Sequence, residues 1–217
     1  MKKNTSYIIC TLILLCFFVS CKSKEITEKP EIERTQEFIA DINPIFLDTV
    51  NLYTKNSVNN PYIAEYNLYF SPRTNSVFIN VTIGITSIRI VFSYSERNAL
   101  YESVKKYLYN YENNLIIQEK PTSKNAYYKG TASIDWGVLA LNYSTDAKYQ
   151  TNVEYLWIDK PYYRLRFEAT DDKDKDASSP AFSVYISPTQ WQTLFDLCNQ
   201  QALEARCDEI LAEADAF

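Results

Sequence analysis

The sequence contains no histidine and only three glycines and five cysteines among its 217 residues. Without histidine there can be no Ser-His-Asp or Cys-His nucleophile and no imidazole metal ligand. The glycines, Gly84, Gly130 and Gly137, cannot form a phosphate-cradling loop of the usual kind. We therefore predict no catalytic residue, no metal and no cofactor, which means a protein that is not an enzyme.

An excess of positive charge is also missing. The chain has 22 Lys and Arg against 27 Asp and Glu, a net charge of −5. A nucleic-acid-binding domain usually has a basic face or stripe. The pair Lys105 and Lys106 is typical of a solvated helix face, so we exclude nucleic acid as a partner.

One acidic segment has a spacing known from calcium loops. Asp172, Asp174 and Asp176 alternate as calcium ligands do, but Ala177 stands where the sharp turn needs glycine and Ser183 where a glutamate closes the loop. The sequence therefore predicts a solvated hairpin loop here, without a metal.

The long hydrophobic run lies at the beginning, in "YIICTLILLCFFVSCKSKE". Lys2 and Lys3 precede it, and it is shorter than the roughly 20 residues that a membrane-spanning helix needs, which is typical of an export signal. The run ends in Phe18, Val19 and Ser20, directly before Cys21. This ending resembles the lipobox of bacterial lipoproteins, although that family prefers leucine where Phe18 stands.

The resemblance covers residues 1–21 and implies a lipid anchor. Residues 1–20 would be a cleaved signal peptide, and Cys21 would carry lipid on its thiol and become the first mature residue. Membrane lipid would then be a partner, and the protein would belong to the bacterial cell envelope. An uncleaved N-terminal anchor, or an ordinary cleaved signal whose cysteine is incidental, are the alternatives.

The rest of the chain divides into a tether and a domain. Residues 21–40 are charged and lack a hydrophobic core, so they predict a flexible tether. Residues 41–217 predict a single α+β domain, long enough to bury a sizeable core.

The expected elements of this domain follow from hydrophobic periodicity. Apolar residues alternate along 76–84 and 87–94, which favours two antiparallel strands, and an apolar stripe along 94–111 favours a helix. A short helix is expected over 43–53, where Asn43 could cap and Pro44 begin it. Further strands are expected in four segments, at 127–143, 153–158, 162–169 and 181–187, with a bend or bulge at Gly137 in the first of them. One long helix is expected after Ser187.

The fold class we predict is α+β, an antiparallel sheet of about six or seven strands with a mid-chain helix and a long C-terminal helix packed on one side. Ser93 and Ser187 each stand between a strand and a helix, which suggests a duplicated unit; any antiparallel sheet that feeds a capped helix would look the same. Cys198 and Cys207 would lie about 13 Å apart along one helix, too far for a disulfide.

The sequence is rich in aromatic residues, with 18 tyrosines and 3 tryptophans. These suit either a binding surface or a tyrosine-rich core. If a binding face exists, we expect it on the outward side of strand 162–169, where Tyr162, Arg164 and Arg166 point away from the core.

These features favour a lipid-anchored, non-catalytic binding or interaction module whose partner is an unidentified protein or small molecule. The alternatives are a structural subunit of an envelope assembly and a hydrolase that uses paired carboxylates.

Overall fold

The computed structural model describes residues 38–56, 60–138, 141–156, 160–172 and 177–215. The expected signal peptide, the Cys21 lipidation site and most of the expected tether lie outside the described residues. Within the described part, no helix is both long enough and apolar enough to cross a bilayer.

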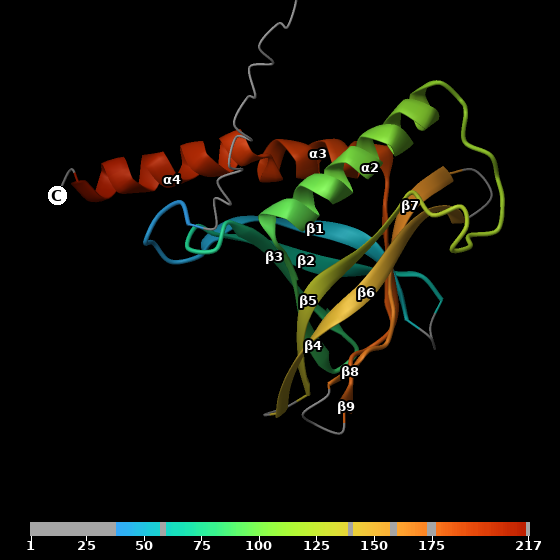
Figure 1. Ribbon diagram of the computed structural model, residues 1–217, viewed down its shortest axis with the longest axis horizontal. Helices are drawn as coiled ribbons and strands as arrows, with labels where there is room; N and C mark the ends of the chain where they lie inside the picture. Colours follow the sequence, from blue (N-terminus) through green and yellow to red (C-terminus); the bar gives the residue numbers. More distant parts are fainter. Residues whose placement is uncertain (1–37, 57–59, 139–140, 157–159, 173–176, 216–217) are drawn as a thin grey trace, which may run out of the picture. The chain divides into compact units, whose positions relative to one another are not determined.

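Eight strands in the described part of the chain form a closed antiparallel barrel (Figure 1). Their order is β1-β10-β7-β6-β5-β4-β3-β2, so most strands pair with their neighbours in sequence, and β10 pairs with β1 to close the ring. The bounds of these strands are Ile45–Asn56 (β1), Tyr62–Ser71 (β2), Ser76–Ile83 (β3), Thr86–Phe92 (β4), Tyr128–Val138 (β5), Leu141–Leu156 (β6), Lys160–Phe167 (β7) and Phe182–Ile186 (β10). A small hairpin of β8 (Asp171–Asp172) and β9 (Ala177–Ser178) lies between β7 and β10.

The expected sheet of about six or seven strands is therefore wrong in strand number, since eight strands close into a barrel, and the antiparallel α+β mix is confirmed. One cause is the segment 43–53, which forms most of β1 and is not a helix, because it pairs with β2 on one side and β10 on the other. Another is β2, which the sequence analysis did not predict. A third is the segment 127–143, expected as a section of sheet with a bend or bulge at Gly137, where the structure has β5 and the beginning of β6 paired as a hairpin.

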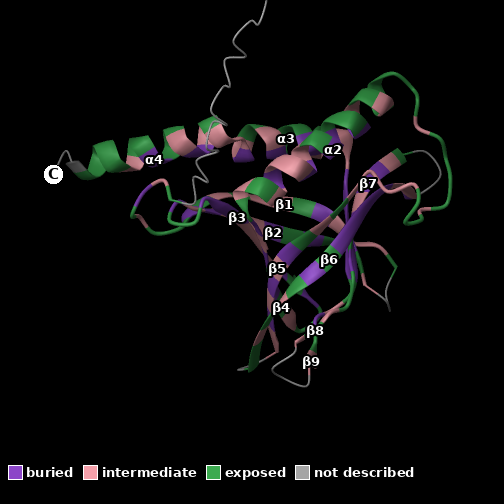
Figure 2. Cartoon of the chain, in the orientation of Figure 1, coloured by how far each residue is buried: buried purple, intermediate pink, exposed green. Residues whose placement is uncertain are grey.

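The barrel interior is filled by alternate side chains of each strand, so buried and exposed segments alternate along the strands in Figure 2. Tyr163, Leu165 and Phe167 of β7 are buried, as the sequence predicts. Several tyrosines of the main core are among the largest side chains with almost no exposure, which confirms a tyrosine-rich core: Tyr66, Tyr107, Tyr149 and Tyr163.

Two helices, α2 (Tyr94–Glu112) and α3 (Pro188–Cys198), lie side by side across one end of the barrel (Figure 1). Ser93 caps α2 and Ser187 caps α3, as predicted. Because the sheet closes on itself, the helices cover an open end of the barrel, whereas the sequence analysis expected them on one side of a sheet.

The expected single C-terminal helix is wrong, because the chain breaks at Asn199 into α3 and α4 (Gln200–Asp215). Asn199 has an extended backbone, with ψ of 150°. Its side-chain amide donates to the carbonyl of Phe195, and its side-chain oxygen accepts from the backbone N–H of Ala202. One side chain therefore ends α3 and begins α4.

The two halves of the barrel have the same order of elements. β1 to β4 lead into α2, and β5, β6, β7 and β10 lead into α3. The helices meet where Tyr101 and Phe195, at matching positions, contact each other edge to face with ring centroids 4.8 Å apart.

Candidate functional site

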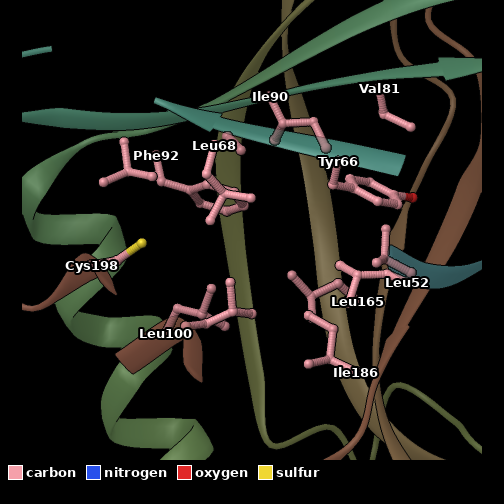
Figure 3. Packing of buried hydrophobic residues seen from close by; sticks show 14 of the residues in the cluster. Leu52, Tyr66, Leu68, Val81, Ile90, Phe92, Leu100, Leu165, Ile186 and Cys198 are labelled. Atoms are coloured by element: carbon pink, nitrogen blue, oxygen red, sulfur yellow. The ribbon is translucent and has the colours of Figure 1, made fainter. Parts of the chain in front are cut away.

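The candidate site is an apolar cavity inside the barrel, directly beneath α2 and α3. Its volume is about 60 Å³. Figure 3 shows side chains of opposite strands pointing inward toward one another, with those of the two helices beside them. The apolar lining comes from six strands and both helices and includes Leu52, Leu68, Ile79, Ile90, Leu100, Leu165, Ile186 and Leu194.

A single charged residue, Arg97, takes part in this lining. It lies in the first turns of α2 and is only 2% exposed. Its Nη2 donates to the side-chain oxygen of Gln200 at 2.6 Å and to that of Asn75 at 3.4 Å. Its guanidinium also lies 5.6 Å from the ring centre of Tyr94. Both hydrogen-bond partners are neutral amides, and no described carboxylate lies within ion-pair distance of Arg97.

Two weak acids also line the cavity next to Arg97. These are the Tyr101 hydroxyl and the Cys198 thiol, whose residues both line it. Burial raises the pKa of Tyr101 far above its ordinary value, and burial raises the pKa of the Cys198 thiol to about 11, although Tyr101 and Arg97 both lower it. Both groups are therefore protonated at neutral pH, and neither neutralises the arginine.

The carboxylate beside Arg97 in sequence turns to another part of the barrel. Glu96 accepts hydrogen bonds from the hydroxyls of Tyr149 at 2.6 Å and Tyr128 at 3.0 Å. Ser93 and Glu96 have the spacing of a capping box, but only half of it forms: the Glu96 backbone N–H donates to Ser93, while the Glu96 side chain holds α2 to β5 and β6. The two hydrogen bonds occupy this carboxylate away from Arg97.

The three residues of the expected binding face on β7 have different surroundings in the structure. Tyr162 is 8% exposed and packs with Leu156 and Tyr185 in a small cluster outside the barrel. Arg164 is half-buried and forms an ion pair of 2.6 Å with Glu154. Of the three expected residues, Arg166 is the exposed one. Arg164 and Arg166 line a shared hollow, but Tyr162 is a packing residue and not an open binding surface.

The remaining sequence expectations concern cysteines and metals. Cys198 and Cys207 are free thiols, as predicted, and the structure buries both of them. In the described residues, no three Asp, Glu or Cys side chains gather as a metal site would require. Asp174 and Asp176 of the calcium-like spacing lie outside those residues.

A comparison with protein families finds a match over residues 26–205 to the family described as "Uncharacterised Treponema protein". The chain belongs to this family. A similar protein from Treponema pallidum (strain Nichols), named "Uncharacterized protein", is 24% identical over 179 residues. The match covers 82% of this chain and 65% of that relative. No solved structure matches the chain significantly.

Arg97 is the residue that the sequence analysis missed. It stands three residues before Leu100 on the same helical stripe as Val104 and Tyr107, so helical periodicity already places it on the buried face. The sequence signal that could have identified Arg97 as a buried residue is therefore an arginine on the apolar stripe of a helix. The identity of its partners, Asn75 and Gln200, depends on contacts between distant parts of the chain.

Proposed function

We propose that this member of the family is a lipid-anchored protein of the bacterial cell envelope that acts, without catalysis, by binding a small molecule inside its barrel. The observation that supports the binding role is the cavity beneath α2 and α3, which is lined by apolar side chains and one buried arginine. Small-molecule sites are typically concave and lined mostly by apolar side chains.

The anchoring part of the proposal rests on residues 1–21. An apolar run after Lys2 and Lys3, ending at Ser20 and Cys21, has the features of a lipoprotein signal. Two or more acyl chains on Cys21 would hold the protein durably, because each buried methylene contributes about 0.8 kcal/mol. The charged segment that follows would act as the tether.

The hydrolase alternative has less support. A glycoside hydrolase, for example, needs two carboxylates that face each other across a cleft. Three hollows on the described part of the chain each contain a single carboxylate, namely Asp135, Glu119 and Glu168.

A structural assembly role is the second candidate, favoured by an aromatic row on the outer face of the barrel. Phe46 is 52% exposed and contacts Tyr69, which in turn stacks on Phe78 with ring centroids 5.0 Å apart. Tyr69 and Phe78 are partly buried, so Phe46 is the exposed ring of this row that could dock on a permanent partner. A Phe46→Ser variant that fractionates from native envelopes in the same complex as wild type would remove this support.

Anchoring is tested by metabolic labelling with radioactive palmitate, followed by membrane fractionation. We expect label on the wild-type chain and on a Cys16→Ala control, and loss of label together with release from membranes for Cys21→Ala. A Cys21→Ala protein that remains fully labelled and membrane-bound would contradict the anchoring proposal.

Binding is tested by native mass spectrometry of the full chain, purified in detergent and incubated with small organic probes. A Leu100→Phe variant enlarges a side chain that lines the cavity, and Leu115→Phe, at an exposed position outside it, is the matched control. We expect wild type and Leu115→Phe to retain a probe that Leu100→Phe excludes. Equal retention by all three proteins would mean that the cavity is not the site.

A further inference from the structure

A second hollow, of about 240 Å³, lies on the barrel where β1, β10 and β7 run side by side. It lies where β1 and β7 end and β10 begins, whereas α3 follows the other end of β10. Three basic residues line it, namely Lys55, Arg164 and Arg166, and none of its lining residues in the described part of the chain is acidic. This basic lining stands on a chain whose net charge is −5.

The strand register places two of the basic side chains on either side of a serine. Ser183 of β10 pairs with Lys55 of β1 on one side and with Arg166 of β7 on the other. Ser183 faces outward, because its neighbours Phe182 and Val184 belong to the core of the barrel. At about 4.8 Å per strand, the Cα atoms of Lys55 and Arg166 are about 10 Å apart. Both long side chains can therefore reach a group that lies above the short side chain of Ser183.

The positive charges around the hollow are only partly balanced. Arg164 forms its ion pair with Glu154, so the charge of Arg164 is compensated. Lys55 and Arg166 are exposed, and neither forms an ion pair with a described residue. The hydroxyl of Ser183 has no hydrogen-bond partner among the described residues and is not fully buried. Two uncompensated cations and one free hydroxyl therefore face the same hollow.

The number of charges decides what kind of anion fits. A phosphate monoester carries a charge of about −1.5 to −2 at neutral pH and three acceptor oxygens, which matches two cations and a hydroxyl. The planar guanidinium of Arg166 can donate two parallel hydrogen bonds to phosphate, and Lys55 supplies a point charge. A carboxylate has one charge and two oxygens, so it would leave one cation unpaired.

The volume of the hollow leaves room for more than the phosphate group. A cavity of about 150 Å³ holds benzene, with its six carbon atoms. A phosphate group has five non-hydrogen atoms, so a hollow of about 240 Å³ has space for a small organic part beside it.

We propose that this hollow binds the phosphate group of a phosphate monoester, whose oxygens contact Arg166, Lys55 and the hydroxyl of Ser183. Arg164 forms a wall of the site and stays paired with Glu154. The site differs from the apolar cavity beneath α2 and α3, so this inference does not rest on the proposed function. The same phosphate group occurs on soluble metabolites and on the headgroup of phosphatidic acid, and the test distinguishes these two sources.

The test is isothermal titration calorimetry of the full chain in an uncharged detergent at pH 7.5, with ionic strength held constant by sodium chloride. The probes are glycerol 3-phosphate, the singly charged diester dimethyl phosphate, acetate, and uncharged glycerol. We expect saturable binding of glycerol 3-phosphate at least ten-fold tighter than that of dimethyl phosphate or acetate, and no binding of glycerol.

Five variants connect this selectivity to the site. Arg166→Gln and Lys55→Gln each remove one charge and should weaken binding at least ten-fold, and Ser183→Ala should weaken it at least two-fold. Arg89→Gln, at an exposed position on β4 three strands from β7, and Lys105→Gln, exposed on α2, remove the same charges elsewhere. These two controls should bind within two-fold of wild type. Circular dichroism melting checks that each variant folds.

A short-chain phosphatidic acid distinguishes the sources of the phosphate group. Binding at least ten-fold tighter than that of glycerol 3-phosphate, and weakened by Arg166→Gln, would support the site with a lipid ligand. Binding no tighter than that of glycerol 3-phosphate would support the site with a soluble ligand.

The remaining outcomes overturn the inference. Dimethyl phosphate or acetate binding as tightly as glycerol 3-phosphate would show that two charges are not needed. Equal losses in Arg166→Gln and Arg89→Gln would show that net charge alone matters, and absence of phosphate binding by the folded wild type would leave no site. Leu100→Phe should bind glycerol 3-phosphate as wild type does, so a failed cavity test and a failed phosphate test remain distinguishable.

Discussion

A Cβ atom at residue 130 would lie 1.8 Å from Oε1 of Glu96, so Gly130 is the residue that lets this carboxylate approach β5. This close approach brings the Glu96 carboxylate within hydrogen-bonding distance of β5 and β6, where it accepts hydrogen bonds from the hydroxyls of Tyr149 and Tyr128. These contacts fix the first turn of α2 against the barrel. The same turn carries Arg97, so the position of the candidate site depends on Gly130.

Gly130→Ala should therefore destabilise the protein by about 1–3 kcal/mol, the usual cost of forcing extra volume into a packed region. Urea denaturation followed by circular dichroism measures the free energy of unfolding. In a Glu96→Ala background the same substitution should cost less, because the clashing carboxylate is gone and the remaining close contact is the ring edge of Tyr128 at 2.6 Å. An equal cost in both backgrounds would show that Glu96 is not what Gly130 accommodates.

The buried hydroxyl of Tyr163 should make the free energy of unfolding depend on pH. Its hydroxyl donates to Thr151 at 2.9 Å and shares a hydrogen bond with Ser103 at 2.5 Å, and burial raises its pKa to about 12 in spite of both hydrogen bonds. Because the pKa of Tyr163 in the folded state lies above its unfolded value of about 10, the stability contributed by the protonated hydroxyl is complete below pH 10. It is lost between pH 10 and 12 at about 1.4 kcal/mol per pH unit.

Tyr163→Phe should cost about 1–2 kcal/mol at pH 8, where the hydroxyl loses its partners and leaves theirs unsatisfied. The difference from wild type should narrow as the pH rises above 10, because phenylalanine has no proton to lose. Urea unfolding at pH 8, 9, 10 and 11 measures this difference, with Tyr109→Phe, at a 60% exposed position, as the control. A difference that stays constant across this range would contradict the assigned pKa direction.

Asn199 should be essential for the turn between α3 and α4. Its side chain donates to the carbonyls of Phe195 and Asp196 and accepts from Ala202, so Asn199→Ala leaves the ends of two helices uncapped. We expect a loss of about 1–2 kcal/mol in the free energy of unfolding, the usual cost of removing a helix cap. Gln201→Ala, an exposed neighbour in α4, should change stability by less than about 0.5 kcal/mol. Similar costs for the two variants would mean that the break at Asn199 does not depend on its side chain.

Parts of this fold could be predicted from the sequence because their signals are local. The strand alternation along 76–84 and 87–94, and the serine caps Ser93 and Ser187, depend on neighbouring residues alone. The inward positions of Tyr163 and Leu165 followed from the same alternation, and the structure confirms them.

Other parts depend on distant contacts. Residues 43–53 contain a plausible helix start at Pro44, yet pairing with β2 and β10 determines their structure. Closure of the barrel requires β10 to meet β1, which no local pattern indicates. The outward orientation of Tyr162 was predicted correctly, but its burial against Tyr185 depends on the neighbouring strand β10.

The candidate site was harder to predict than the fold. Charged side chains are expected at the surface of a folded protein, and most of them do lie there. Arg97 is an exception that becomes visible only when α2, α4 and the turn between β2 and β3 are brought together. The expected face on β7 was chosen by residue type, and the structure gives Arg164 a partner, Glu154, that residue type alone could not reveal.

The ion pair of Arg164 and Glu154 can be compared with a second ion pair in the chain that has the same N···O distance but is more exposed. Arg164 and Glu154 lie 2.6 Å apart with side chains 12% and 24% exposed, and Arg206 and Glu209 lie 2.6 Å apart with side chains 52% and 61% exposed. Solvent screens an exposed pair strongly and a half-buried pair much less.

Double-mutant cycles with Arg→Met and Glu→Gln should therefore give about 1–3 kcal/mol of coupling for the half-buried pair and about 0.3–0.5 kcal/mol for the helical pair in α4. Urea unfolding at low and at about 1 M salt checks the cause, since the coupling of Arg206 with Glu209 should nearly vanish while that of Arg164 with Glu154 persists. If Arg164 were instead free to bind an external anion, its coupling to Glu154 would be no larger than the control, and the expected binding face on β7 would regain a charged residue.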